Sequence, residues 1–189
     1  MFNDLHSPAT LAATRRSGKP RDMVAPGPDA TQLRTILSAA MRVPDHGKLA
    51  PWRFVVIDED RRDAFAAMLQ QAWRAEHATV DRPDVEAINQ FARQAPALVV
   101  VLSTPVEAKI SVWEQQLSAG AACMTMLTAA HAEGFVGSWL TGWAAYSPAV
   151  VAELGHPGAA LAGFVFIGSP GCALSERPRP AYDSIVSRW

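Results

Sequence analysis

The sequence has few cysteines and almost no net charge, and each of these shortages narrows what the protein can be. Its 189 residues include 2 cysteines, Cys123 and Cys172, which are too few for a disulfide framework or a cysteine-rich metal centre. We therefore expect a reducing, cytoplasmic setting. A total of 17 basic residues against 18 acidic ones gives a net charge of -1, which excludes a general attraction to nucleic acid or anionic membranes.

The motifs of several common protein classes are also missing. No Gly-x-Gly-x-x-Gly or Walker sequence is present, so a Rossmann or P-loop fold has little support. Gly-x-Ser-x-Gly is absent, and the histidines lack the spacing of metal ligands, so we expect neither a hydrolase elbow nor a metal site. Polar residues interrupt the most apolar stretch, 117–132, which falls short of the ~20 apolar residues that span a bilayer. The N-terminus lacks a signal-peptide pattern, and we expect a soluble protein.

What is abundant is alanine, concentrated in segments with helical spacing. Hydrophobic residues make up 49% of the chain. Alanine favours helices and lets them approach closely, but each alanine buries little surface. The core is therefore expected to need bulk from elsewhere, such as a partner chain or a bound apolar ligand.

Helix and strand signals are interspersed along the chain, which predicts a single α+β domain over residues 1–189. Periodic apolar positions and capping residues predict helices over 8–14, from the cap Asp29 towards Pro44, after the acidic run 58–60, and over 85–93, 110–132 and from 147 onwards. Buried strands are expected at 52–57 and 97–102, a strand or strand entry at 136–140, and a further strand at 163–168. A charged surface segment is expected at 76–86 and a proline-rich tail after 170.

Three groups of residues could support chemistry, and the first is Arg15-Arg16-Ser17 at the end of a predicted helix. Two guanidinium groups beside a hydroxyl offer the forked donors that a phosphate monoester requires. A double arginine is more often a solvated surface feature, so the residues by themselves leave both readings open.

The second group lies in a loop between Pro44 and Pro51, which contains His46 and Lys48 and leads into Trp52. Loops held by rigid elements are favoured positions for binding residues. The alternative is an ordinary connection between a helix and a strand.

The third group is the stretch 134–143, in which glycines alternate with Trp139 and Trp143. Glycine permits close backbone approach, and indole rings offer planar faces to an aromatic ligand. A core tryptophan beside a tight turn would produce the same pattern. The helix at 110–132 is more typical of a core or dimer interface.

Taken in order, these groups resemble the nitroreductase family of FMN-dependent oxidoreductases, and in particular its short NAD(P)H nitroreductases. The resemblance covers nearly the whole chain. Its motifs are Arg15-Arg16-Ser17, Ile36-Leu37 through Met41-Arg42-Val43-Pro44-Asp45-His46, Pro51-Trp52-Arg53-Phe54, Trp113-Glu114-Gln115 with Ser118-Ala119-Gly120, Gly134-Phe135 to Trp139, and Gly163-Phe164-Val165-Phe166-Ile167-Gly168.

This resemblance implies a three-layer α/β/α sandwich with a mostly antiparallel sheet, in an intertwined homodimer with FMN at the interface. It also implies ping-pong hydride transfer from NAD(P)H through flavin N5 to a nitroaromatic, quinone or similar planar acceptor, with no catalytic side chain. The residues it assigns to FMN are Arg15, Arg16 and Ser17 at the phosphate and ribityl end, Arg42, Pro44, His46 and Lys48 from the partner subunit, and Trp139, Leu140 and Thr141 along the ring.

Some positions depart from the family pattern. Lys48 stands where many relatives have asparagine, Ala50 where they have glutamine, and Leu140 where close relatives can have a basic residue. The resemblance also implies a C-terminal basic residue near the phosphate, for which Arg177 and Arg179 are the two candidates. These departures motivate an alternative function, a flavin-binding carrier or sensor without efficient turnover. A helical dimerisation domain without cofactor is a third reading, and no residue distinguishes NADH from NADPH.

Overall fold

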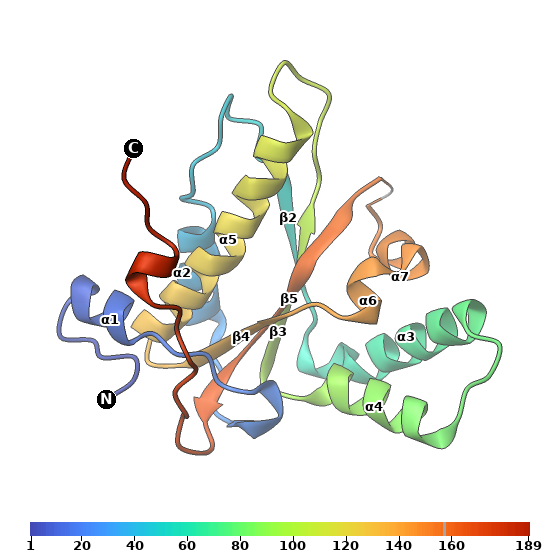
Figure 1. Ribbon diagram of the computed structural model, residues 1–189. Helices are drawn as coiled ribbons and strands as arrows, with labels where there is room; N and C mark the ends of the chain where they lie inside the picture. The colour runs from blue at the N-terminus through green and yellow to red at the C-terminus, as the bar shows by residue number, and fades with distance from the viewer. Residues whose placement is uncertain (157) are drawn as a thin grey trace.

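Strand β5 (Ala160–Pro170) is the centre of the sheet, and the other strands are arranged around it. The computed structural model describes residues 1–156 and 158–189 (Figure 1). In it β5 pairs with β3 (Ala97–Ser103), β4 (Val136–Leu140) and the short β1 (Met23–Val24), and β2 (Trp52–Val56) pairs with β3. These pairings are all antiparallel, as predicted for this sheet.

Side chains of the two inner strands are buried on both faces of the sheet. In β5, Phe164 and Phe166 enter one apolar cluster while Val165 and Ile167 enter another on the opposite face. Residues 98–102 of β3 are also fully buried. The continuous apolar run in the sequence therefore identified a strand that is covered on both faces.

Helices form a layer on each face, which confirms the predicted three-layer sandwich (Figure 1). One layer contains α2 (Ala30–Ala40) and the long α5 (Val112–Ala132), and small residues such as Ala40 and Ala130 are fully buried where they pack. The other layer contains α3 (Arg62–Glu76), α4 (Arg82–Arg93), α6 (Trp143–Tyr146) and α7 (Pro148–Glu153).

Most helix ends lie at the capping residues that the sequence predicted. Helix α1 (Pro8–Thr14) has the predicted bounds, and Ser7 caps its N-terminus. The Asp29 carboxylate accepts a hydrogen bond from the Gln32 amide, and the Ser147 hydroxyl accepts one from Val150. Gly134 ends α5 with a φ of +86°, a conformation that glycine adopts without strain.

Some predicted elements differ from those in the structure. Helix α4 begins at Arg82 rather than residue 85, because Asp81 caps it and Pro83 fits its first turn. The predicted surface segment 76–86 therefore shrinks to a short connection. Helix α2 stops at Ala40, before Pro44, and α6 was not predicted. β2 is an edge strand in which Trp52 alone is buried, so its prediction as a buried strand was wrong.

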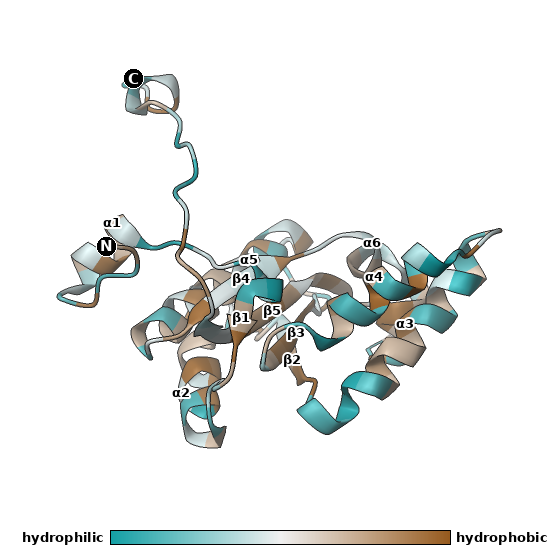
Figure 2. Ribbon diagram, turned by 90° about the horizontal axis from the view of Figure 1, so that it is seen from below, coloured by the Kyte–Doolittle hydropathy of each residue, from teal (hydrophilic) through white to brown (hydrophobic). Residues whose placement is uncertain are grey.

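Outside the layers lie the two ends of the chain and, within the described residues, three short 3₁₀ helices. These are η1 (Pro20–Asp22), η2 (Glu59–Arg61) and η3 (Tyr182–Ser184). The C-terminal segment leaves the body of the molecule, and residues 176–189 are exposed along their whole length (Figure 2). Among the described helices, none is long and apolar enough to cross a membrane.

The two cysteines have different surroundings. Cys123 is fully buried in α5, and burial raises the pKa of its thiol to about 12, so it is unreactive at neutral pH, as expected. Cys172 is exposed in the segment after β5.

Candidate functional site

Arg15, Arg16 and Ser17 follow directly after α1, and hydrogen bonds hold them in place. The carboxamide of Asn3 clamps the backbone of Arg16: its Nδ2 donates to the Arg16 carbonyl at 3.1 Å, and its Oδ1 accepts from the Arg16 amide at 2.8 Å. The Nη1 atom of Arg15 donates to Ser17 Oγ at 3.1 Å. The three residues named by the sequence are therefore adjacent and have a fixed backbone.

Positive charges crowd together around Arg15. Burial, chiefly, and then the charges of Arg179 and Arg16 lower the pKa of Arg15 below its ordinary value. Of the two tail arginines that the sequence left open, Arg179 is thus the one whose charge acts on this cluster. Guanidinium groups that repel one another in a half-buried position favour a bound anion.

The C-terminal tail supplies partners for two of these cations, Arg16 and Arg179. Arg16 Nε donates to the Ser175 carbonyl at 2.7 Å and lies 4.0 Å from the Glu176 carboxylate. The same carboxylate is 3.7 Å from Arg179. A carboxylate on an exposed segment therefore lies between two of the arginines.

His131, near the C-terminal end of α5, is a neighbour of this cluster that sequence reasoning missed. It is only 1% exposed, and its Nε2 accepts a hydrogen bond from the Gly137 amide at 3.2 Å. Its Nδ1 has no hydrogen-bond partner within residues 1–156 and 158–189. Burial, and secondarily the charge of Arg15, lowers the pKa of His131 to about 4, so the ring is neutral near pH 7. Nothing local in the sequence marked it, because its neighbours come from β4 and the N-terminal segment.

The loop 44–51 has an unusual backbone that its own side chains stabilise. The Asp45 carboxylate accepts hydrogen bonds from the amides of Leu49 at 3.1 Å and Ala50 at 2.8 Å. Lys48 and Ala50 have φ values of +57° and +47°, in the left-handed region that side chains disfavour. Such strained residues persist where surrounding contacts hold them, and they cluster at functional sites.

Two side chains of α5 attach this loop to the body of the protein. Ser118 Oγ donates to the Pro44 carbonyl at 2.7 Å, and His46 Nδ1 lies 2.8 Å from Glu114 Oε2. Glu114 and Ser118 belong to the motif Trp113-Glu114-Gln115 with Ser118-Ala119-Gly120. The sequence by itself assigned no function to this motif. The remaining predicted loop residues, Arg42 and Lys48, are exposed.

The loop and the arginines lie at opposite ends of α5. Glu114 holds the loop and His131 neighbours Arg15, and at 1.5 Å per residue these two positions in α5 are roughly 25 Å apart. One chain therefore does not bring the loop and the arginine cluster into a common site.

The third predicted group divides between the two faces of the sheet. Trp139 lies on the α5 face, 38% exposed, and its Nε1 donates to the Ala162 carbonyl at 2.8 Å. The indole covers Gly163, where a side chain would collide with it. Leu140 points to the opposite face and packs against the cluster beneath α3 and α4. Side chains of successive strand residues point to opposite faces of the sheet, so the Leu140 side chain does not lie on the face that carries Trp139. Only the backbone of Leu140 is accessible from that face.

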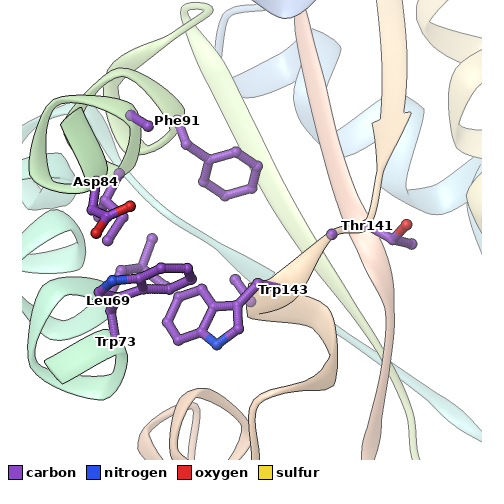
Figure 3. A pocket seen from close by; sticks show the side chains of 10 residues that line it. Leu69, Trp73, Asp84, Phe91, Thr141 and Trp143 are labelled. Atoms are coloured by element: carbon purple, nitrogen blue, oxygen red, sulfur yellow. The ribbon is translucent and has the colours of Figure 1, made fainter. Parts of the chain in front are cut away.

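Thr141 leads into an apolar cavity of about 210 Å³ between α4, α3 and the start of α6. Figure 3 shows Phe91, Trp73 and Trp143 around this space, with Asp84 at one side and the Thr141 side chain pointing away. Within the described residues, no group of histidine, cysteine or carboxylate side chains is arranged to hold a metal ion.

Comparison with known proteins identifies the family. The model of the Nitroreductase family matches residues 12–169. The chain belongs to the nitroreductase family. It is 36% identical over 162 residues to the Escherichia coli (strain K12) protein named "Putative NAD(P)H nitroreductase YdjA", covering 85% of this chain and 86% of that one.

Solved structures share the nitroreductase fold over nearly the whole chain. A nitroreductase-like protein from Bacillus cereus superposes with a TM-score of 0.83 at 18% identity, covering 100% of this chain and 99% of that one. A nitroreductase from Desulfovibrio desulfuricans, solved in complex with FMN, gives 0.74 at 23% identity, with 97% and 98% covered. The predicted family and fold are thereby confirmed.

The neutral state of His131 predicts a pH-dependent stability. The unfolded chain binds a proton at this histidine near pH 6.5, whereas the folded chain does so only near pH 4. The free energy of unfolding should therefore fall as pH is lowered from 6.5 to 4, by up to about 3 kcal/mol. Urea unfolding at several pH values measures this. His131→Gln, which has no group that titrates, should lose most of the slope over that window, while an unchanged slope would contradict the assignment.

Proposed function

We propose that this nitroreductase family member is an FMN-dependent NAD(P)H oxidoreductase that acts as a homodimer, with residues 1–189 forming one FMN-binding domain. The observation that supports this most directly is the arginine cluster, in which Arg15 and Arg16 adjoin Ser17 and the Glu176 carboxylate lies between Arg16 and Arg179. The Desulfovibrio relative was solved with FMN, and the curated Escherichia coli relative bears an NAD(P)H nitroreductase name.

The residues at the cluster fit the phosphate end of FMN. Guanidinium groups bind phosphate through two parallel N–H donors, and the Ser17 hydroxyl adds a short donor beside them. A phosphate dianion would also relieve the repulsion that lowers the pKa of Arg15. The Asn3 clamp fixes the Arg16 backbone, so less ordering is required when the phosphate binds.

The distance between the two halves of the site supports a homodimer. A two-fold partner whose α5 runs antiparallel would bring its loop residues Arg42, Pro44, His46 and Lys48 towards the arginines of the first subunit. Apolar side chains of α5 are exposed on one chain by 40–67%, namely Val112, Trp113, Leu117 and Met124. An apolar helix of this kind is normally covered on all sides. The exposed tail adds further apolar groups, including Tyr182, Ile185 and Trp189.

FMN supplies the redox chemistry, so the chain needs no nucleophile of its own. Trp139 and the backbone at Leu140 and Thr141 would lie along the ring, and Lys48 would stabilise negative charge on the reduced cofactor. We infer a ping-pong reaction in which NAD(P)H and then a planar acceptor, such as a quinone or nitroaromatic, use the same position in turn. A flavin carrier without turnover is the competing function.

The visible spectrum of the purified protein tests the function. We expect a yellow protein whose flavin absorbance is bleached by NAD(P)H without oxygen and restored by a quinone. A protein that stays colourless after incubation with FMN would refute the proposal. Bound flavin that NAD(P)H does not reduce would favour the carrier.

Removing one phosphate contact should weaken cofactor binding. Arg16→Ala is expected to raise the Kd for FMN by about ten- to a hundredfold, since it removes a charge-assisted hydrogen bond. Quenching of flavin fluorescence measures the Kd. Arg21→Ala is the matched control, because Arg21 is an exposed arginine paired with Asp22 and outside the cluster. Equal Kd values for both variants would remove Arg16 from the site.

A shared site also predicts complementation between two defective chains. Arg16→Ala and the loop variant Arg42→Ala/Lys48→Ala should each be impaired alone. Because each heterodimer contains one site with both halves intact, mixed refolding should restore roughly a quarter of the sites to wild-type FMN affinity. Equilibrium titration of the mixture counts these sites. Their absence, with heterodimers present by native mass spectrometry, would place both halves in one subunit.

A further inference from the structure

His46 and Glu114 form a carboxylate–imidazole pair at the tip of the strained loop. The His46 Nδ1 and Glu114 Oε2 atoms are 2.8 Å apart, and the side chains are 66% and 41% exposed. A carboxylate bound to one ring nitrogen fixes the orientation of an imidazole and stabilises its protonated form. The other nitrogen, Nε2, has no partner among the described residues.

Glu114 is itself held in its ionised form. It lies in the first turn of α5, where the helix dipole favours negative charge, and Ser111 Oγ donates to its Oε1 at 3.3 Å. The hydrogen bond from His46 is the main cause that keeps the pKa of Glu114 below its usual value. Because an ionised carboxylate only accepts hydrogen bonds, the imidazole must donate through Nδ1–H.

The backbone that carries His46 is fixed on both sides of it. Pro44 accepts the hydrogen bond from Ser118, and Asp45 binds the amides of Leu49 and Ala50. A Cβ at Gly47, where φ is +83°, would lie 3.2 Å from Ile110. The other charged groups of the loop are Asp45, which is used in these amide bonds, and the exposed Lys48.

We propose that His46 is a catalytic residue that donates a proton from Nε2 to the acceptor as it is reduced, and that Glu114 is the positioning residue that holds it. This inference rests on the proposed function, under which the loop lies at the cofactor of the partner subunit.

The proton completes the chemistry of the acceptor. A quinone needs two electrons and two protons to become a hydroquinone. NAD(P)H supplies a hydride through the cofactor, equivalent to two electrons and one proton, and the second proton comes from His46. The Nε2–H bond breaks as an O–H bond forms on the quinone oxygen. His46 is left neutral with Nδ1–H still bound to Glu114, and water protonates Nε2 again at its exposed side.

The experiment compares an acceptor that needs protons with one that does not. Wild type, His46→Gln, Glu114→Gln and His6→Gln are loaded with FMN and reduced with NAD(P)H, and then mixed with benzoquinone or with ferricyanide in a stopped-flow instrument. His6→Gln is the matched control, since His6 forms the same kind of pair with Asp4, 2.7 Å apart, in the N-terminal segment.

We expect His46→Gln to slow oxidation by benzoquinone about a hundredfold, within the usual contribution of a general acid, and oxidation by ferricyanide less than threefold. His6→Gln should change neither rate. Glu114→Gln should also slow oxidation by benzoquinone, because the imidazole loses the carboxylate that orients it, while oxidation by ferricyanide stays within threefold. A merely structural role would slow both reactions alike.

Other outcomes overturn the proposal. Equal slowing with both acceptors would mean that His46 only holds the cofactor, and an unchanged benzoquinone rate would mean that it has no role. Each variant is checked by circular dichroism, and His46→Asn replaces His46→Gln if that variant fails to fold. Wild type that remains colourless would refute the proposed function instead, so the two failures are distinguishable.

Discussion

Helix α5 is apolar around most of its circumference, and this property determines how the rest of the molecule is arranged. One side packs against the sheet through fully buried residues such as Met126 and Ala130. Helix α2 covers another side, with small residues allowing close approach. The sides that remain expose Trp113 and Leu117, which a single chain does not cover. The alanine-rich composition implied apolar surface that the chain cannot cover by itself. That uncovered surface is concentrated along α5 and is not spread through the core.

The same helix organises the polar groups. Near its N-terminus, Glu114 and Ser118 hold the loop that contains His46 and Lys48, and near its C-terminus His131 neighbours Arg15. The net charge of -1 conceals these two local groups of basic residues, because acidic residues elsewhere in the chain offset them. His131 remains neutral beside Arg15. A protonated ring at this position would add a positive charge next to the guanidinium groups, and the neutral ring does not.

Features that depend on neighbours in sequence were predictable, and features that depend on distant contacts were not. Asp29, Ser147 and Gly134 fix helix ends through their own local geometry, so the sequence located those ends. The arginine pair was likewise visible as adjacent letters. The Asn3 clamp, in contrast, joins residues 13 positions apart, and the His46–Glu114 pair joins residues 68 positions apart. No pattern of spacing in a single sequence reports such contacts. The resemblance to the family supplied the fold, but it did not indicate that β2 is a partly buried edge strand.

Gly163 shows how a site can depend on a residue with no functional group. It lies in β5 below the indole of Trp139, at a φ of +153°, and its missing side chain makes room for the hydrogen bond from the indole to Ala162. Any replacement would force the ring off the sheet or distort the central strand. Position 163 therefore accommodates only glycine without such a displacement, although glycine contributes no chemical group to the site. Tolerance to mutation at this position is set by the space that the indole already fills.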